Sequence, residues 1–226
     1  MMFDSDRVNL YRTHINYKGL LVNTQNPEWR GMEVQGTSGK MLKNYRGTCS
    51  TSPLPSSNLV YWEVEADVEL DKPLGGLDLV LEVGVCGEDV MNSSHFIGDK
   101  PNSCSLCLSN DENNVRRFIA FNGKDIATSE VFENKVGTSV TVRYGVLVDT
   151  DKMAVSFLDT NKREVLGTGC IADSKPQHSA GYKRKMWPVF AVYSSPKRVE
   201  MKLVSGPDLQ MDDWKKKLLE DAIHVY

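Results

Sequence analysis

Apolar and polar residues alternate without interruption over residues 60–70. The run reads VYWEVEADVEL, with an apolar residue at every even position and an acid at four of the five odd ones. Successive side chains of a β-strand point to opposite faces, so this period of two predicts a strand with one buried face and one face in water. Such strands are typical of an antiparallel sheet covered on one side.

Two later segments repeat the alternation and predict further strands. Residues 77–85 carry an apolar side chain at every odd position, and the turn at 71–76 favours a hairpin with the preceding strand. Residues 140–148 carry an apolar side chain at every even position. After a polar turn at 149–152, the alternation continues on the way back over residues 153–157.

Short apolar runs bounded by turn residues extend this pattern. Residues 118–121 lead into Asn122-Gly123, a dipeptide that strongly favours a two-residue hairpin because both positions tolerate positive φ. Residues 188–192 and 199–203 predict two more short strands. Many short strands at intervals of roughly 8–12 residues indicate an all-β fold, a sandwich or a barrel.

The C-terminal residues alone have a helical pattern. Asp212 and Asp213 suit the start of a helix, where acidic side chains are favoured by the helix dipole. The apolar residues on one face of this helix are Trp214, Leu218, Ala222 and Val225. We therefore expect a sandwich over residues 1–206, including a loosely patterned N-terminal segment, and a helical tail over 207–226 packed on or beside it.

Composition narrows the range of partners and compartments. The chain has 226 residues, of which 40% are hydrophobic and 25% charged, and its net charge is −3. This acidic balance argues against a nucleic-acid or anionic-membrane partner, and no run of about 20 apolar residues is long enough to span a bilayer. The five scattered cysteines do not form a disulfide framework, so we expect a reducing, cytoplasmic compartment.

Candidate chemistry is sparse. Cys104 and Cys107 form a lone C-x-x-C motif near His95, but a zinc site needs four ligands, and a strand over 103–109 would place the two thiols on opposite faces. The histidines do not neighbour a nucleophile motif, and G-x-S-x-G is absent. We expect no enzyme activity, no metal and no cofactor; a catalytic triad assembled from distant loops stays open as an alternative.

Three ordered pieces of the sequence resemble the SPRY (B30.2-like) domain. The strand VYWEVE at 60–65, followed by EVGV at 82–85, is similar to the YWEV and GV strands of that family. Residues 145–157 resemble its GVLLDLDxGTLSF hairpin, and residues 186–193 its LYPAVSAVW strand. The resemblance covers roughly residues 30–205 and implies a bent sandwich of two antiparallel sheets.

Two branches of the family carry this domain in ubiquitin-ligase pathways, the tripartite-motif ligases and the SPRY-domain SOCS-box proteins. Residues 29–39 are similar to the HRHPVAQSTDG loop of the second branch, and Tyr45-Arg46-Gly47 to its IRG motif. After Gly206 the sequence departs from that branch and shows no ligase-recruiting box. A RING cysteine–histidine array is also lacking, so we expect no ligase activity of the chain itself.

The resemblance also implies which residues bind a partner. Tyr193 and Ser194 stand where the family has Trp-Gly, and three residues of the early loop stand where it has Arg, Pro and Ala. An arginine offers five hydrogen-bond donors, and aromatic side chains offer rigid contact area. The residues expected to bind a peptide are Arg30, Met32, Val34, Phe96, Tyr193 and Ser194.

These observations predict a protein-interaction module rather than an enzyme. A sandwich buries its inner faces, so recognition falls to loops held at one end of a rigid frame. We expect a peptide or protein target, with substrate recognition for a ubiquitin-ligase pathway as the setting that the resemblance implies. A glycan-binding, lectin-like sandwich and an architectural domain of a larger assembly are the alternatives. The sequence does not indicate the oligomeric state.

Overall fold

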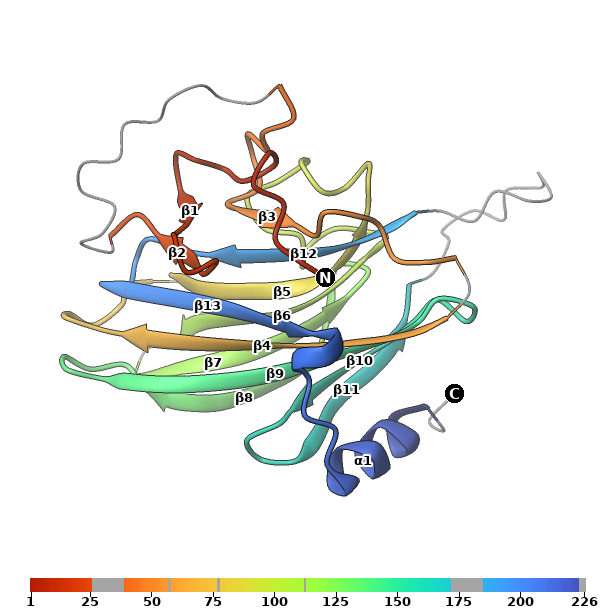
Figure 1. The fold of residues 1–226 in the computed structure, drawn as a ribbon. Helices are drawn as coiled ribbons and strands as arrows, with labels where there is room; N and C mark the ends of the chain where they lie inside the picture. Colours follow the sequence, from red (N-terminus) through yellow and green to blue (C-terminus); the bar gives the residue numbers. More distant parts are fainter. Residues whose placement is uncertain (26–38, 57, 77, 112, 172–184, 224–226) are drawn as a thin grey trace.

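The computed structural model describes residues 1–25, 39–56, 58–76, 78–111, 113–171 and 185–223, which form two antiparallel sheets stacked face to face (Figure 1). The first sheet contains, in spatial order, β1 (Thr13–Ile15), β2 (Leu21–Asn23), β13 (Arg198–Ser205), β4 (Leu59–Glu69), β9 (Ser139–Asp149), β10 (Ala154–Asp159) and β11 (Glu164–Cys170). The second contains β3 (Gly47–Cys49), β12 (Met186–Val192), β5 (Leu79–Gly87), β6 (Ser103–Asp111), β7 (Asn114–Phe121) and β8 (Lys124–Glu133). The expected all-β sandwich is confirmed.

The alternating strands supply the core between the sheets. Trp62 and Val64 of β4 and Val83 of β5 each expose 1% or less of their surface and belong to one apolar cluster shared by both sheets. Burial of such side chains stabilises the fold by roughly 1.5–3 kcal/mol each. The period-two pattern of residues 60–70 therefore identified the inner face of this strand correctly.

The predicted hairpin at Asn122-Gly123 is confirmed. Both residues have positive φ, 52° and 78°, and Phe121 of β7 pairs with Lys124 of β8. These backbone angles are those of the tight turn that matches the twist of an antiparallel pair.

The predicted hairpin between residues 60–70 and 77–85 is wrong. β4 lies in the first sheet and β5 in the second, so residues 71–76 cross from one sheet to the other. A register shift between Leu79 and Leu81 also breaks the expected alternation. As a result Val80 and Leu81 are both in the inter-sheet core, whereas Leu79 packs on the outer face.

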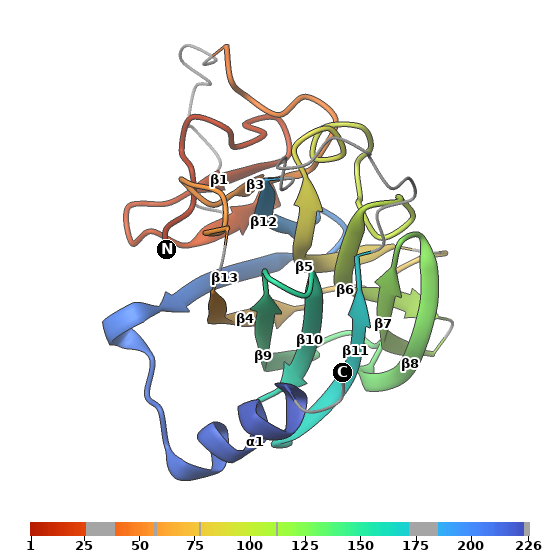
Figure 2. The ribbon, with the colours of Figure 1, turned by 90° about the vertical axis from the view of Figure 1, so that its right-hand side faces the viewer.

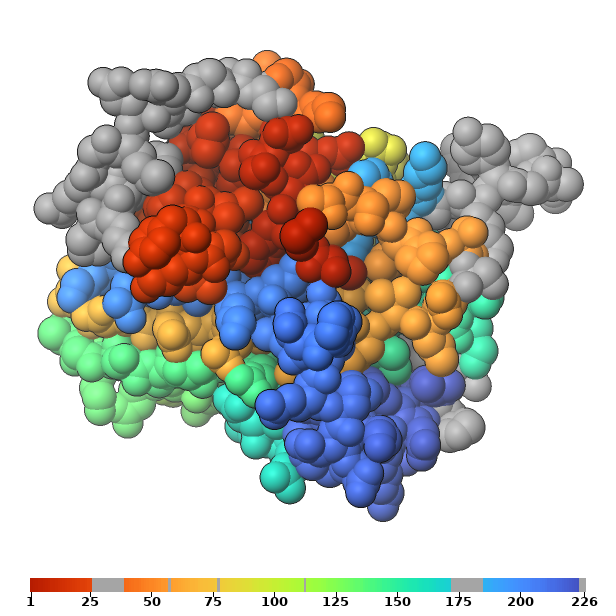
Figure 3. Space-filling view, viewed as in Figure 1, coloured from red at the N-terminus to blue at the C-terminus, as the bar shows by residue number. Residues whose placement is uncertain are grey.

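A helix covers part of the outer face of the first sheet. After a short 3-10 turn, η2 (Gly206–Asp208), α1 (Asp213–Ile223) runs alongside β9, β10 and β11 (Figure 2). On the face seen in Figure 3 it forms a ridge at the lower right. Ala222 is fully buried against Leu147 and Leu158, and the described part of the chain has no helix long and apolar enough to cross a membrane.

An ion pair beneath α1 corrects the expectation that the acidic face of residues 60–70 lies in water. The Lys215 ammonium lies 2.6 Å from the Glu63 carboxylate, and the two side chains are 7% and 2% exposed. The Tyr61 hydroxyl donates a hydrogen bond to the same carboxylate at 2.8 Å. Glu63 is thus buried by a residue more than a hundred positions away, which no local pattern could reveal.

Candidate functional site

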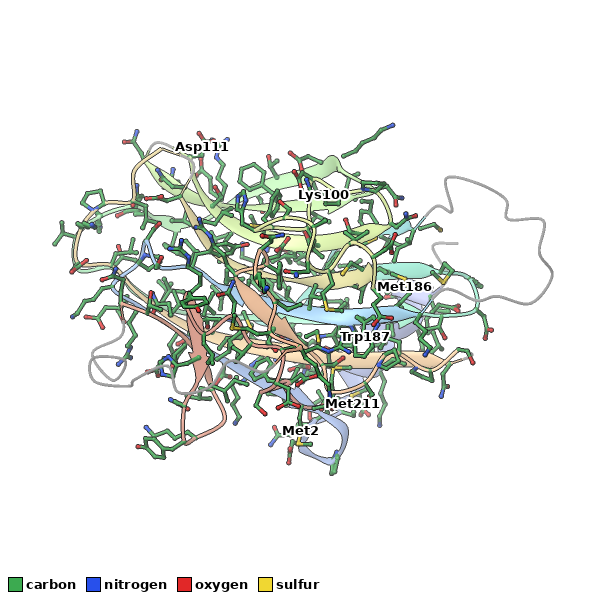
Figure 4. All side chains as sticks on the ribbon, turned by 90° about the horizontal axis from the view of Figure 1, so that it is seen from above. Met2, Lys100, Asp111, Met186, Trp187 and Met211 are labelled. Atoms are coloured by element: carbon green, nitrogen blue, oxygen red, sulfur yellow. The ribbon has the colours of Figure 1, made fainter. Side chains whose placement is uncertain are left out.

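A loop covers the outer face of the second sheet. This cover loop, residues 88–102, connects β5 to β6 and packs on β5 and β12 together with residues 42–49 (Figure 4, where Lys100 and Trp187 are labelled). The apolar residues joined there are Leu42, Tyr45, Cys49, Cys86, Val90, Met91, Ile97, Trp187, Val189, Ala191 and Tyr193. β5 is consequently buried on both faces.

Glu82 anchors the cover loop from below. Its side chain is fully buried, and its Oε1 accepts hydrogen bonds from the backbone N–H groups of Ile97 at 3.2 Å and Gly98 at 3.1 Å. The Tyr193 hydroxyl donates to the His95 carbonyl at 3.1 Å and lies 3.4 Å from Glu82 Oε2. Burial raises the pKa of Glu82 to about 7, because removal from water penalises the charged carboxylate.

Phe96 lies against the backbone of the same loop. A Cβ atom on Gly98 would come within 2.5 Å of the Phe96 ring and 2.8 Å of Ser105 Oγ. Only glycine allows this close approach, so Gly98 lets the Phe96 ring pack directly against the backbone of the loop.

A polar depression of about 590 Å³ opens beside the cover loop, where three chain segments meet. We call it the basic depression. Its lining residues are Asn9, Tyr11, Arg12, Lys43, Asn44, Arg46, Ser93, Ser94 and His95.

Two asparagines hold the walls of the basic depression together. Asn9 Nδ2 donates to the carbonyls of Lys43 at 3.3 Å and Tyr45 at 2.7 Å. Asn92 Oδ1 accepts from the backbone N–H groups of Lys43 at 2.9 Å and Asn44 at 2.8 Å. These bonds tie the N-terminal segment, residues 43–45 and the cover loop to one another, so the depression is a built feature of the fold.

A second, mainly apolar depression of about 320 Å³ lies on the other side of His95 and Phe96. We call it the apolar depression. Its lining residues are Leu79, His95, Phe96, Ser105, Cys107, Ser109, Phe118, Ala120 and Asp125. His95 borders both depressions, which therefore adjoin one another.

The sequence-predicted binding residues are only partly brought together. Arg30, Met32 and Val34 lie outside the described residues. Phe96 is half-buried and lines the apolar depression.

Tyr193 and Ser194 do not have the places expected of contact residues. Tyr193 is only 2% exposed and supports the cover loop through its hydroxyl, so in this structure it positions His95 instead of presenting an aromatic surface. Ser194 is half-buried just beyond β12 and lines neither depression.

Sequence reasoning missed most of the residues that line or hold the basic depression. Arg12, Lys43 and His95 stand in segments without a pattern, and Asn9 and Asn92 act on backbone groups 34 or more positions away. Arg46 did fall within a stretch quoted for the family resemblance, and that was the one signal available for it.

The thiols do not form a reactive or metal-binding cluster in the described part of the chain. Cys104 belongs to the inter-sheet core and Cys107 to the opposite face of β6, as predicted. Burial raises the pKa of both thiols well above the ordinary value. Among the described residues, no group of three or more His, Cys, Asp or Glu could hold a metal ion.

Known proteins resemble this chain in structure but not in overall sequence. No family model and no curated protein matches the sequence. The TRIM65 PSpry domain superposes with a TM-score of 0.56 at 15% identity, covering 91% of this chain and 92% of that one. Stonustoxin gives 0.54 at 16% identity, covering 90% of this chain and 26% of that one. The SPRY domain of human HERC1 gives 0.46 at 13% identity, covering 93% and 99%.

The likeness to TRIM65 extends over nearly the whole of both chains, so it concerns the complete architecture and not one motif. It agrees with the two antiparallel sheets seen here and with the ordered YWEV, GVLVD and WPVFAV strands of the sequence. The chain therefore has the fold of a SPRY domain.

Proposed function

We propose that this chain is a protein-interaction module that holds a peptide or a segment of a target protein across the basic and apolar depressions. The observation that carries the proposal is that these two depressions adjoin at His95 and Phe96. Ligand sites are concave, combine apolar walls with a few placed polar groups, and fall within about 300–1,000 Å³. Both depressions lie within that range.

The rigidity of the site supports the same function. The walls are loops, but hydrogen bonds donated by Asn9 and accepted by Asn92 and Glu82 fix them to each other and to β5. A loop surface that is fixed before binding loses little conformational entropy when a partner arrives. Loops on a rigid sandwich are where such folds carry recognition.

The wider setting is part of the proposal. Substrate recognition for a ubiquitin-ligase pathway is supported by the sequence resemblance to two SPRY branches that work in such pathways. All five cysteines are unpaired, which supports a reducing, cytoplasmic compartment. The lack of catalytic activity and of nucleic-acid or membrane partners stays a prediction, motivated by the net charge of −3 and the absence of a sequence motif for catalysis.

A peptide-display selection tests the proposal. The full chain is panned against a random 12-residue phage-displayed library, and the selected peptides are remade with a fluorophore for anisotropy titration. Phe96→Ala removes an aromatic wall of the apolar depression, so we expect affinity to fall about tenfold, as for an aromatic contact near the centre of an interface.

Trp214→Ala is the matched control for this experiment. Trp214 is a half-buried aromatic residue on α1, which packs on the other sheet, and its truncation should leave affinity unchanged. Equal affinities for the wild type and the Phe96→Ala protein, or a selection without binders, would contradict the assignment of this surface as the binding site.

A further inference from the structure

We propose that the target segment is acidic, with two or more Asp or Glu side chains over the basic depression and one large apolar side chain in the apolar depression. This inference rests on the proposed function and names the chemistry of its ligand. Charge, size and the shape of the neighbouring depression support it in turn.

Among the described residues, no acidic side chain compensates the charge of the basic depression. Arg12, Lys43 and Arg46 line it, and within the described part of the chain none of them forms a salt bridge and no acidic side chain joins the lining. Several other cations of this chain do have carboxylate partners, such as Arg117 with Asp159 at 3.0 Å and Arg116 with Asp111 at 2.6 Å.

The chain as a whole has a net charge of −3, so this cationic cluster is opposite in sign to the net charge of the molecule. Unpaired like charges held close together repel one another, and an oppositely charged partner relieves that repulsion. Complementary charge also selects partners and raises the rate of association.

The size of the basic depression favours several carboxylates over a single anion. At about 590 Å³ it has the volume of a site for a whole small molecule rather than for one carboxylate or phosphate group. Arg12 and Lys43 are exposed, and Arg46 is half-buried. The cations therefore line an open depression and are not buried together at one point. This arrangement suits the spaced side chains of an acidic peptide.

The apolar depression has a floor of small residues and walls of large ones. Ser105, Cys107 and Ala120 are nearly fully buried at its base, while Phe96 and Phe118 are half-buried around it. Small floor side chains between aromatic walls leave room for one large aliphatic or aromatic side chain of the partner.

Asp125 sets the order of the two parts of the ligand. It is an exposed carboxylate in the lining of the apolar depression, whereas the basic depression has no acid among its described lining residues. Repulsion from Asp125 disfavours acidic groups on that side. The acidic residues are therefore directed to the side of Arg12 and Lys43, with the apolar side chain beyond His95.

The peptides selected from the display library test this chemistry directly. We expect enrichment of sequences that contain at least two Asp or Glu residues next to a Trp, Phe, Leu or Ile. The strongest binder is then remade in three forms: with Asp and Glu changed to Asn and Gln, with the apolar anchor changed to Ala, and with its acids replaced by one phosphoserine. We expect each of the first two forms to bind about tenfold more weakly than the parent.

Charge reversal on the protein provides the complementary test. The double variant Arg12→Glu/Lys43→Glu should weaken binding of the acidic peptide by about tenfold or more. Added salt should reduce the difference in affinity between the variant and the wild type, because it screens the charges. Lys162→Glu/Lys217→Glu changes the net charge equally at exposed positions on the other sheet and on α1, and should leave affinity within about twofold. Asp125→Asn should strengthen binding slightly.

The outcomes separate this inference from the proposed function. If Phe96→Ala weakens binding but the selected peptides are not acidic, or the Arg12/Lys43 reversal has no effect, the site stands and the acidic ligand is wrong. Tighter binding of the phosphoserine form than of the carboxylate parent also overturns the inference, in favour of a phosphopeptide. A library without binders contradicts both proposals.

Discussion

At the scale of single residues, Glu82 fixes the cover loop that borders the proposed binding site. The backbone N–H groups of Ile97 and Gly98 donate to its buried carboxylate. These two residues directly follow His95 and Phe96, which border the depressions. The alternation of residues 77–85 predicted an outward side chain at position 82, but not that a loop would close over it.

The raised pKa of Glu82 makes stability depend on pH in an unusual direction. The carboxyl takes up its proton near pH 7 in the folded chain and near 4.5, its ordinary value, in the unfolded chain. Between these values the folded state binds more protons, so the free energy of unfolding decreases as pH rises from 4.5 to 7 and then levels off. The contribution of Glu82 over this interval is roughly 3 kcal/mol.

Glu82→Gln should remove that pH dependence. Its amide oxygen can still accept both loop N–H groups, but it does not titrate. Urea unfolding at pH 5 and pH 8 measures the effect: the loss of stability between the two pH values should be smaller in the variant by roughly 2–3 kcal/mol. All other groups titrate in both proteins, so an unchanged difference would mean that Glu82 is already ionised at pH 5.

At the scale of elements, α1 is attached to the first sheet by one buried ion pair as much as by apolar contact. Lys215 reaches Glu63 at 2.6 Å and donates a further hydrogen bond to the carbonyl of Gln210 at 2.9 Å. The helical pattern of the tail correctly predicted an element there, with Ala222 on its buried face. It did not predict that a lysine of the same helix would be buried too.

Lys215→Met should therefore destabilise the fold strongly. The methionine keeps an apolar stem but leaves the Glu63 carboxylate buried without a cation, which costs about 3–5 kcal/mol in comparable sites. Chemical denaturation monitored by tryptophan fluorescence measures the change. The double variant Glu63→Gln/Lys215→Met should recover most of the loss, and a purely additive double variant would show that the two charges are not coupled.

At the scale of the whole molecule, a second buried ion pair connects one sheet to the other. Arg117 of β7 lies 3.0 Å from Asp159 of β10, with both side chains 7% exposed. The strands belong to different sheets, so the pair acts across the sandwich interior and not within one layer. The sequence did not reveal this pair, because the two residues stand 42 positions apart and no local pattern links them.

Asp159→Asn should lower the free energy of unfolding by about 3 kcal/mol, because Arg117 then stays buried with its remaining carboxylate partner, Glu164, 3.8 Å away. Asp111→Asn is the matched control: it breaks the neighbouring Arg116 pair, which is more than a third exposed, and should cost at most about 1 kcal/mol. Equal losses in urea unfolding would contradict a special role for the buried pair.

The limits of sequence reasoning follow the same physical division. Residues 60–70 and 140–148 were correctly identified as strands because residues two positions apart share one environment, and this period is visible within the segment itself. The connection between β4 and β5 was predicted wrongly as a hairpin. Which strand pairs with which depends on contacts throughout both sheets, and the sequence of two neighbouring segments does not contain that information. Of the six expected binding residues, Phe96 lies at the proposed site, Tyr193 lies beneath it, and Ser194 lines neither depression. The other three, in the early loop, are outside the described part of the chain.

The order of apolar and polar residues alone determined that this chain is an all-β fold, a sandwich or a barrel, with a helical tail, and the family resemblance favoured the sandwich. Such periodicity is local: it needs only that successive side chains of a strand point to opposite faces. Only the tertiary structure decided where the proposed binding site lies. Arg12, Lys43 and His95 come together because three distant segments converge. The hydrogen bonds that hold them there, donated by Asn9 and accepted by Asn92, leave no trace in any local pattern.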